Sequence, residues 1–258
     1  MNKDIKMSLA DALDVGAGAV VSLVGGGGKT TSMFRLAGEL AARGLRVVTT
    51  TSTHISREQV ELSPAVVSTG CLSRLGPLLD RHGQCLVVGA PDDRDRVFGS
   101  PPEEIALLAA RADVDVVVIE ADGSRSLPFK APAEHEPVVH PLTTLLVAVA
   151  GIDILGAPLD EEHVHRARRA AALAGVPEGV PVTAEIVARV LAHPLGGAKG
   201  RPDGARFVPL VNRADDAAAA ARGREILALL VQHPGVDRAL LCSLLQPDPV
   251  IERREKVK

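Results

Sequence analysis

The chain has 258 residues, which is enough for one α/β domain with a full hydrophobic core. Hydrophobic residues make up 46% and charged residues 24% of the chain, a balance that excludes an intrinsically disordered protein. The formal net charge of −3 and the lack of Trp and Tyr argue against nucleic-acid binding and against attraction to anionic membranes.

The sequence also indicates where the protein works. No run approaches the about 18 apolar residues of a membrane span, and residues 1–14 lack the apolar segment of a signal peptide. Cys71, Cys85 and Cys242 are widely spaced and form no paired motif, as expected of reduced thiols. We therefore expect a cytoplasmic protein with no nucleic-acid partner and no membrane attachment.

The first predicted elements surround a glycine loop. A short helix is expected at residues 8–15, followed by a strand rich in β-branched residues at 19–24. The strand leads into four consecutive glycines and a Lys-Thr-Thr sequence, after which apolar residues recur at helical spacing. This order of strand, loop and helix is typical of a phosphate-binding loop, in which backbone N–H groups and the helix N-terminus bind phosphate oxygens.

The residues of such a loop have definite roles. Lys29 is expected to reach the β- and γ-phosphates as the main catalytic cation, and the hydroxyl of Thr30 to ligate Mg²⁺. The match to the general loop pattern is incomplete, because Leu23 stands six positions before Lys29 where a glycine is usual. The residues predicted to cradle the phosphates are Gly25, Gly26, Gly27, Gly28, Lys29, Thr30 and Thr31.

Polar residues follow the second predicted strand, at 45–50. The sequence Thr-Ser-Thr-His-Ile at 51–55 would lie at the carboxyl end of this strand, where open α/β sheets bind their ligands. A serine- and threonine-rich turn is the alternative, with His54 a surface or capping residue. Further along the chain the sequence predicts a helix at 72–81, a strand at 85–88, a solvated loop at 92–96 and a helix at 103–111.

Two carboxylates follow a buried strand predicted at 114–119. Glu120 and Asp122 stand where the companion carboxylate of a phosphate-binding loop holds Mg²⁺ directly or through water. Alternation places both on one side if the strand persists, and they would serve Mg²⁺ and the attacking water. Gly123 would bring its backbone N–H close to the γ-phosphate. An ordinary acidic turn after a core strand is the alternative.

The middle of the chain leaves several roles open. Residues 127–141 contain four prolines and should be extended, either as a substrate or switch segment or as a rigid surface connection. A strand is predicted at 144–150 and a helix at 160–174. On a helix, His163 and His165 would point to nearly opposite sides, so they could share a metal ion only if this turn were irregular. A phosphate or substrate role for His163, His165 or Arg166 stays open.

A base-reading motif is predicted near the C-terminus. The strand predicted at 207–211 ends in Asn212-Arg-Ala-Asp215, which resembles the guanine-reading motif of GTPases with Arg213 in place of the usual lysine. Asn212 and Asp215 would therefore contact the base, unless this is a chance turn. The remaining predicted elements are a helix at 183–191, a flexible loop at 196–204, a helix at 217–232, a final strand at 239–243 and a flexible charged tail at 247–258.

Several of these stretches together resemble one family. They are residues 24–31, 49–54, 120–137, 151–156, 162–166 and 212–215. In combination they resemble the YqeC family, accessory proteins of selenium-dependent molybdenum hydroxylases, over about residues 15–245. The resemblance implies a P-loop protein that supplies selenium or molybdenum cofactor, with the hydroxylase or its cofactor-maturation machinery as partner. The loop also resembles that of metal-insertion and partitioning NTPases, which suggests a homodimer, although Val24 replaces the lysine that acts across the dimer there.

We expect a three-layer α/β P-loop NTPase fold with a mainly parallel sheet, formed by a single domain over residues 1–246. The predicted function is Mg²⁺-dependent binding and slow hydrolysis of GTP or ATP, with Lys29, Glu120 and Asp122 as catalytic residues. Two alternatives stay open. One is a small-molecule kinase or ATP-dependent ligase with an acceptor pocket in the proline-rich loop and at 163–166. The other is a non-catalytic carrier that uses nucleotide as a conformational ligand.

Overall fold

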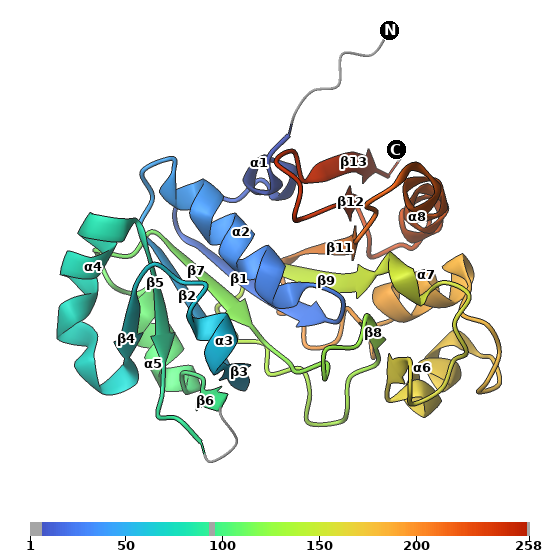
Figure 1. The fold of residues 1–258 in the computed structure, drawn as a ribbon, viewed down its shortest axis with the longest axis horizontal. Helices are drawn as coiled ribbons and strands as arrows, with labels where there is room; N and C mark the ends of the chain where they lie inside the picture. The colour runs from blue at the N-terminus through green and yellow to red at the C-terminus, as the bar shows by residue number, and fades with distance from the viewer. Residues whose placement is uncertain (1–6, 93–95, 257–258) are drawn as a thin grey trace, which may run out of the picture.

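The structure is a computed structural model that describes residues 7–92 and 96–256. A nine-stranded sheet forms its centre. Its strands are β1 (Ala19–Gly25), β2 (Val47–Thr51), β4 (Val66–Ser68), β5 (Gln84–Val88), β7 (Val116–Glu120), β9 (Leu145–Gly151), β11 (Arg206–Asn212), β12 (Arg238–Cys242) and β13 (Val250–Glu255). Their order is β13-β12-β11-β9-β1-β7-β2-β5-β4 (Figure 1), and only β13 is antiparallel to its neighbour. The predicted α/β class with a mainly parallel sheet is confirmed.

Helices cover both faces of this sheet. They are α1 (Leu9–Leu13), α2 (Lys29–Ala41), α3 (Arg57–Val60), α4 (Leu75–His82), α5 (Pro102–Ala109), α6 (Ala167–Ala174), α7 (Ala184–Ala192) and α8 (Ala217–Leu230). Buried side chains of α1 and α2 form one apolar core with one face of the sheet. Those of α4 to α8 form a second core with the opposite face. The layers are therefore helix, sheet and helix, as predicted.

The alternation of side chains in β7 decides where its last residue points. Val116 and Val118 belong to the core beneath α1 and α2, whereas Val117 and Ile119 belong to the opposite core. Because successive residues of a strand face opposite sides, Glu120 falls on the same face as Val116 and Val118. The strand register thus directs the Glu120 carboxylate toward the start of α2.

Two short ladders lie outside the central sheet. One pairs β8 (Phe129–Lys130) in parallel with β10 (Val164–His165), and the other pairs β3 (His54–Ser56) antiparallel to β6 (Arg96–Phe98). The short 3₁₀ helices are η1 (Thr69–Arg74) and η2 (Ile152–Ile154). Within the described ranges, no helix is both long and apolar enough to cross a membrane.

Two predicted elements are wrong. The helix predicted at 160–174 begins only at Ala167, because the preceding residues form a turn and β10, and Arg166 adopts φ 65° between them. The buried pairing of Val164 with Phe129 outweighs the helical propensity of this segment. The flexible tail predicted at 247–258 contains β13, which pairs with β12. The solvated loop at 92–96 was predicted across residues 93–95, which lie outside the described residues, and its last residue begins β6.

Ion pairs explain why a charged segment forms β13. Arg253 of this strand contacts Asp14 at 3.1 Å, and Glu252 contacts Arg224 of α8 at 3.1 Å. Arg35 of α2 donates to the carbonyls of Gln246 and Pro247, just before the strand. The polar residues therefore pair across the edge of the sheet while staying partly exposed.

We predict that deleting residues 250–258 lowers the thermal midpoint of unfolding, because β12 loses its neighbour and Asp14 loses Arg253. A loss of about 1–2 kcal/mol is expected, which for a chain of this size is roughly 2–8 °C. The measurement is thermal unfolding by circular dichroism, with a deletion of residues 257–258 alone as the control. An unchanged midpoint in the longer deletion would show that β13 does not stabilise the fold and would support the predicted flexible tail.

Candidate functional site

The glycine loop between β1 and α2 closes tightly against its neighbours. Gly27 and Gly28 have φ of 76° and 134°, values that side chains rarely adopt. A Cβ at Gly27 would overlap the backbone of Gly151, and one at Gly28 would overlap the amide of Asn212. No side chain caps α2 at Gly28, so the first N–H groups of this helix face the loop. Such an uncapped N-terminus is suited to binding an anion.

Lys29 places its ammonium group at this helix start. Its Nζ donates to the carbonyl of Gly25 at 2.8 Å. It also lies 3.5 Å from Glu120 and 3.4 Å from Asp122. The side chain is almost fully buried, and the two carboxylates compensate its charge.

Thr30 and Glu120 form a pair of oxygen donors beside the loop. The Thr30 hydroxyl donates to the Glu120 carboxylate at 2.7 Å, and the Gln59 amide donates to the same hydroxyl at 3.1 Å. Hydroxyl and carboxylate oxygens suit Mg²⁺, which binds one or two protein oxygens together with phosphate and water. Within the described ranges no group of three or more His, Cys, Asp or Glu is arranged to hold a metal ion. These residues therefore fit a Mg²⁺ that is shared with a phosphate rather than enclosed by protein.

Asp122 has a different environment from Glu120. Both of its carboxylate oxygens accept the backbone N–H of Gly25, at 3.1 Å each. Lys130 approaches the same carboxylate to 2.9 Å. Asp122 is only 1% exposed, so it holds the glycine loop from below instead of facing the ligand side.

A second charged cluster continues from Asp122 through Lys130. The Lys130 ammonium donates to the carbonyl of Gly123 and to Glu136, both at 2.7 Å. Arg166 binds Glu136 through two hydrogen bonds of 2.7 and 3.0 Å. Burial alone would raise the pKa of Glu136, but hydrogen bonds from Lys130 and Arg166 outweigh it and lower the pKa to about 2. This carboxylate is therefore ionised at neutral pH and couples the glycine loop to β10.

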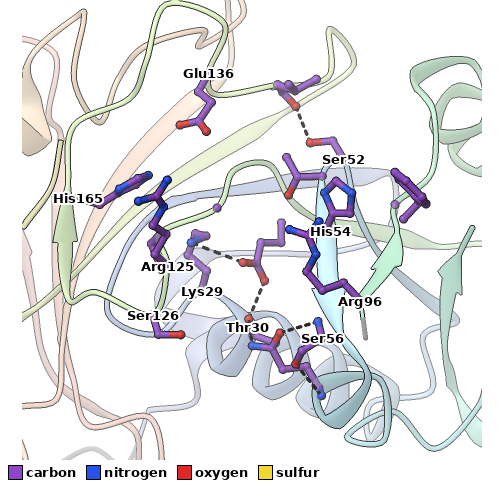
Figure 2. A pocket seen from close by; sticks show the side chains of 18 of the residues that line it. Lys29, Thr30, Ser52, His54, Ser56, Arg96, Arg125, Ser126, Glu136 and His165 are labelled. Atoms are coloured by element: carbon purple, nitrogen blue, oxygen red, sulfur yellow. Dashed lines mark hydrogen bonds and ion pairs between the residues drawn. The ribbon is translucent and has the colours of Figure 1, made fainter. Parts of the chain in front are cut away.

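These elements enclose a cavity of about 950 Å³. Figure 2 shows Lys29 and Thr30 on its floor, His54, Ser56 and Arg96 on one side, and Arg125 and His165 on the other. Of the predicted site residues, those that line it are Gly27, Gly28, Lys29, Thr30, Thr31, Glu120 and Gly123. The predicted site residues that do not line the cavity are Gly25, Gly26, Asp122, Asn212 and Asp215. The polar cluster after β2 also reaches the cavity, through Ser52, Thr53 and His54.

The predicted base-reading residues lie on the other side of the loop. The Asn212 amide donates to the carbonyl of Gly27 at 2.9 Å and accepts the N–H of Leu244 at 3.2 Å. Asp215 is exposed, and one of its oxygens accepts the hydroxyl of Ser243. Arg213 turns away to Asp153, at 2.5 Å. Asn212 therefore braces the glycine loop, and Asp215 retains an oxygen that can accept further hydrogen bonds.

Sequence reasoning missed how closely three charged residues join the site. The sequence placed all three only within longer stretches, Lys130 and Glu136 in the proline-rich segment 127–141 and Arg125 in the family stretch 120–137. No sequence signal marks Lys130 as buried, because its burial follows from the pairing of β8 with β10 and from its ion pairs with Asp122 and Glu136. The two histidines are not on a helix as predicted: His163 lies in the turn before β10 and binds Asp160, whereas His165 lies on β10 and lines the cavity.

Comparison with known proteins gives the family. The family model described as YqeC protein matches residues 21–168. The protein YqeC of Escherichia coli (strain K12), described as uncharacterized, is 35% identical over 256 residues, which cover 98% of each of the two proteins.

Two solved structures are similar at low identity. Chloroplast FtsY from Physcomitrella patens is 16% identical with a TM-score of 0.43, over 86% of this chain. The signal recognition particle receptor FtsY from Elizabethkingia anophelis, in complex with GDP, is 14% identical with a TM-score of 0.34, over 88% of this chain. The chain spans 58% and 49% of these two structures. The family match over more than half of the sequence and the full-length relative place the chain in the YqeC family.

Proposed function

We propose that the chain binds a nucleoside triphosphate with Mg²⁺ at the glycine loop and hydrolyses it slowly. The observation that carries the proposal is the position of the Lys29 ammonium at the uncapped start of α2, beside Glu120 and the Thr30 hydroxyl. At this helix start a cation, N–H groups without a capping side chain and oxygens suited to Mg²⁺ lie close together. Binding of phosphoryl groups requires this combination.

Each residue then has a role that follows from its contacts. The N–H groups of Gly28 and Lys29 would bind phosphate oxygens, and the Lys29 ammonium would leave the carboxylates for the more highly charged phosphates. Thr30 and Glu120 would hold Mg²⁺. When bound, this ion would neutralise charge on the phosphates. Asp122 is a positioning residue, because its carboxylate fixes Gly25 and is buried against Lys130.

Guanine is the base that the geometry favours. The free oxygen of Asp215 can accept hydrogen bonds from the N1–H and amino group of guanine, whereas adenine presents an acceptor at N1. Ser243 holds the other oxygen and so fixes the orientation of the carboxylate. Asn212 ties this strand end to Gly27, which sets the base-reading loop at a constant distance from the phosphates.

The biological role proposed here rests on the family. We propose that nucleotide binding serves the maturation of a selenium-dependent molybdenum hydroxylase, in supply of its selenium or molybdenum cofactor. The partner would be the hydroxylase or its maturation machinery, and the chain would act in the cytoplasm, alone or as a homodimer. Copurification of the hydroxylase with the chain, dependent on the bound nucleotide, tests this role.

Replacing Lys29 with methionine is predicted to abolish triphosphate binding while leaving the chain folded. The variant keeps the aliphatic stem but removes the charge, so affinity should fall at least about a hundredfold. Binding of a fluorescent triphosphate analogue is the measurement, and Lys256→Met at an exposed position is the control. Undiminished affinity for the triphosphate in a folded Lys29→Met variant would show that the nucleotide does not bind at this loop.

Glu120→Gln and Asp122→Asn are predicted to fail in different ways. The first should lose most of the Mg²⁺ dependence of triphosphate binding and keep its thermal midpoint. The second should leave two buried lysines poorly compensated and cost about 3–5 kcal/mol of stability. Magnesium titrations and thermal unfolding separate the two effects. The opposite pattern would be an Asp122→Asn variant that keeps its thermal midpoint but loses the Mg²⁺ dependence of triphosphate binding. It would assign the Mg²⁺ site to Asp122 and the structural role to Glu120.

GTP is predicted to bind more tightly than ATP, by about ten- to a hundredfold, because mispaired polar groups cost on the order of 1–3 kcal/mol. Asp215→Ala should remove most of this preference, and Asp216→Ala, which affects only the cap of α8, should keep it. Competition titrations with both triphosphates measure the ratio. Equal or tighter ATP binding in the unaltered chain would contradict guanine recognition.

A further inference from the structure

A second set of polar side chains faces the cavity away from the glycine loop. Arg125, in the loop after β7, and His165, on β10, both line it. Figure 2 shows Arg125 between His165 and Lys29. Neither residue belongs to the phosphate-binding loop, the Mg²⁺ pair or the base-reading motif, so the proposed function assigns no role to either.

Arg125 is presented by a strained turn. Arg125 and Ser126 have φ of 52° and 63°, in the left-handed region that disfavours residues with a side chain. The turn is held by the N–H of Leu127, which donates to Ser124, and by the N–H of Gly27, which donates to the carbonyl of Leu127. Strain of this kind concentrates at ligand-binding sites. Within the part of the chain that the structure describes, the exposed guanidinium of Arg125 has no hydrogen bond or ion pair.

His165 is a buried polar side chain without a partner. It is 7% exposed, and its ring makes no hydrogen bond with another described residue. Burial, followed by the charges of Arg166, Lys130 and Arg125, lowers the pKa of His165 to about 4. The imidazole is therefore neutral at physiological pH, with one donor and one acceptor nitrogen, on a side chain that lines the cavity. Because the ring lines the cavity and has no hydrogen bond to another described residue, a ligand in the cavity can supply one.

The charges around His165 select the sign of that ligand. Arg125, Arg166 and Lys130 act on it against the carboxylate of Glu136. Arg166 and Lys130 are already paired with Glu136 and Asp122, so the charge left uncompensated is that of Arg125. This excess of positive charge favours an anion. The cavity of about 950 Å³ lies at the upper end of the range for small-molecule sites, so it has room beyond the phosphates of a nucleotide.

We propose that this part of the cavity binds a second, anionic small molecule, with a carboxylate or phosphate group held by Arg125 and His165 beside the γ-phosphate. The inference rests on the proposed function, because it places this molecule next to a bound nucleotide. The protein would then act on two ligands at once, and Arg125 and His165 would select the second one.

The test is calorimetric titration of inorganic phosphate and, separately, malonate into the protein saturated with Mg²⁺ and either GDP or a non-hydrolysable GTP analogue. Ionic strength is held constant with chloride. We expect one of the two probes to bind both loaded forms with similar affinity. Phosphate binding indicates a phosphate ester as the natural ligand, and malonate binding indicates a carboxylate. Arg125→Gly and His165→Gln should each weaken that binding by about tenfold or more.

The choice of variants separates binding from folding. Arg125→Gly removes the guanidinium and also relieves the strain at φ 52°, so its thermal midpoint should be equal to or above that of the unaltered chain. Arg168→Ala, an exposed arginine on α6 outside the cavity, should leave probe binding unchanged. An equal loss of binding in Arg168→Ala would show that general charge, rather than a built site, attracts the probe.

Two other outcomes overturn the inference. Probe binding to the GDP form but not to the triphosphate form would show that Arg125 and His165 serve the γ-phosphate itself. Absence of binding to either form would exclude the site altogether. In both cases nucleotide binding stays intact, whereas failure of the proposed function would appear earlier, as a chain that takes up no nucleotide.

Discussion

The site depends on the contact between the buried carboxylate of Asp122 and the backbone N–H of Gly25. An ionised group that is 1% exposed is costly unless it is paired and hydrogen-bonded, and here Lys29 and Lys130 supply the opposite charge. The contact fixes the first glycine of the loop, and the glycines that follow can then close against β9 and Asn212. The buried ion pairs around Asp122 therefore position the loop.

This arrangement divides the two carboxylates after β7 between two tasks. Glu120 is the last residue of the strand and points toward α2, where Thr30 meets it, whereas Asp122 lies beyond the strand and turns under the loop. Lys130 then extends the network to Glu136 and Arg166, so that the glycine loop and β10 share one chain of ion pairs. A phosphate that drew Lys29 away from its carboxylates would change the charge balance along these ion pairs. The same ion pairs reach Arg166, next to His165 in the cavity lining.

Much of this could be predicted from the sequence. The strand, the glycines and Lys29 carry a local pattern, and the buried strand before Glu120 has the apolar composition that parallel sheets require. Two-residue strands such as β8 and β10 have no period to detect, which is why residues 160–166 were predicted as helix. Long-range pairing was equally hidden, because β13 is charged along its length and is recognised only through partners on α8 and near α1. The burial of Lys130 is likewise a tertiary property.

In the proposed site, phosphate replaces carboxylate at Lys29. A crystal structure of the chain with Mg²⁺ and a non-hydrolysable GTP analogue tests this exchange. We expect β- and γ-phosphate oxygens within about 3 Å of the Lys29 ammonium and of the N–H groups that open α2. We also expect Mg²⁺ beside Thr30 and Glu120, with Asp122 still bound to Gly25. A nucleotide found away from the glycine loop, or Lys29 still paired with both carboxylates while nucleotide is bound, would rule out the exchange.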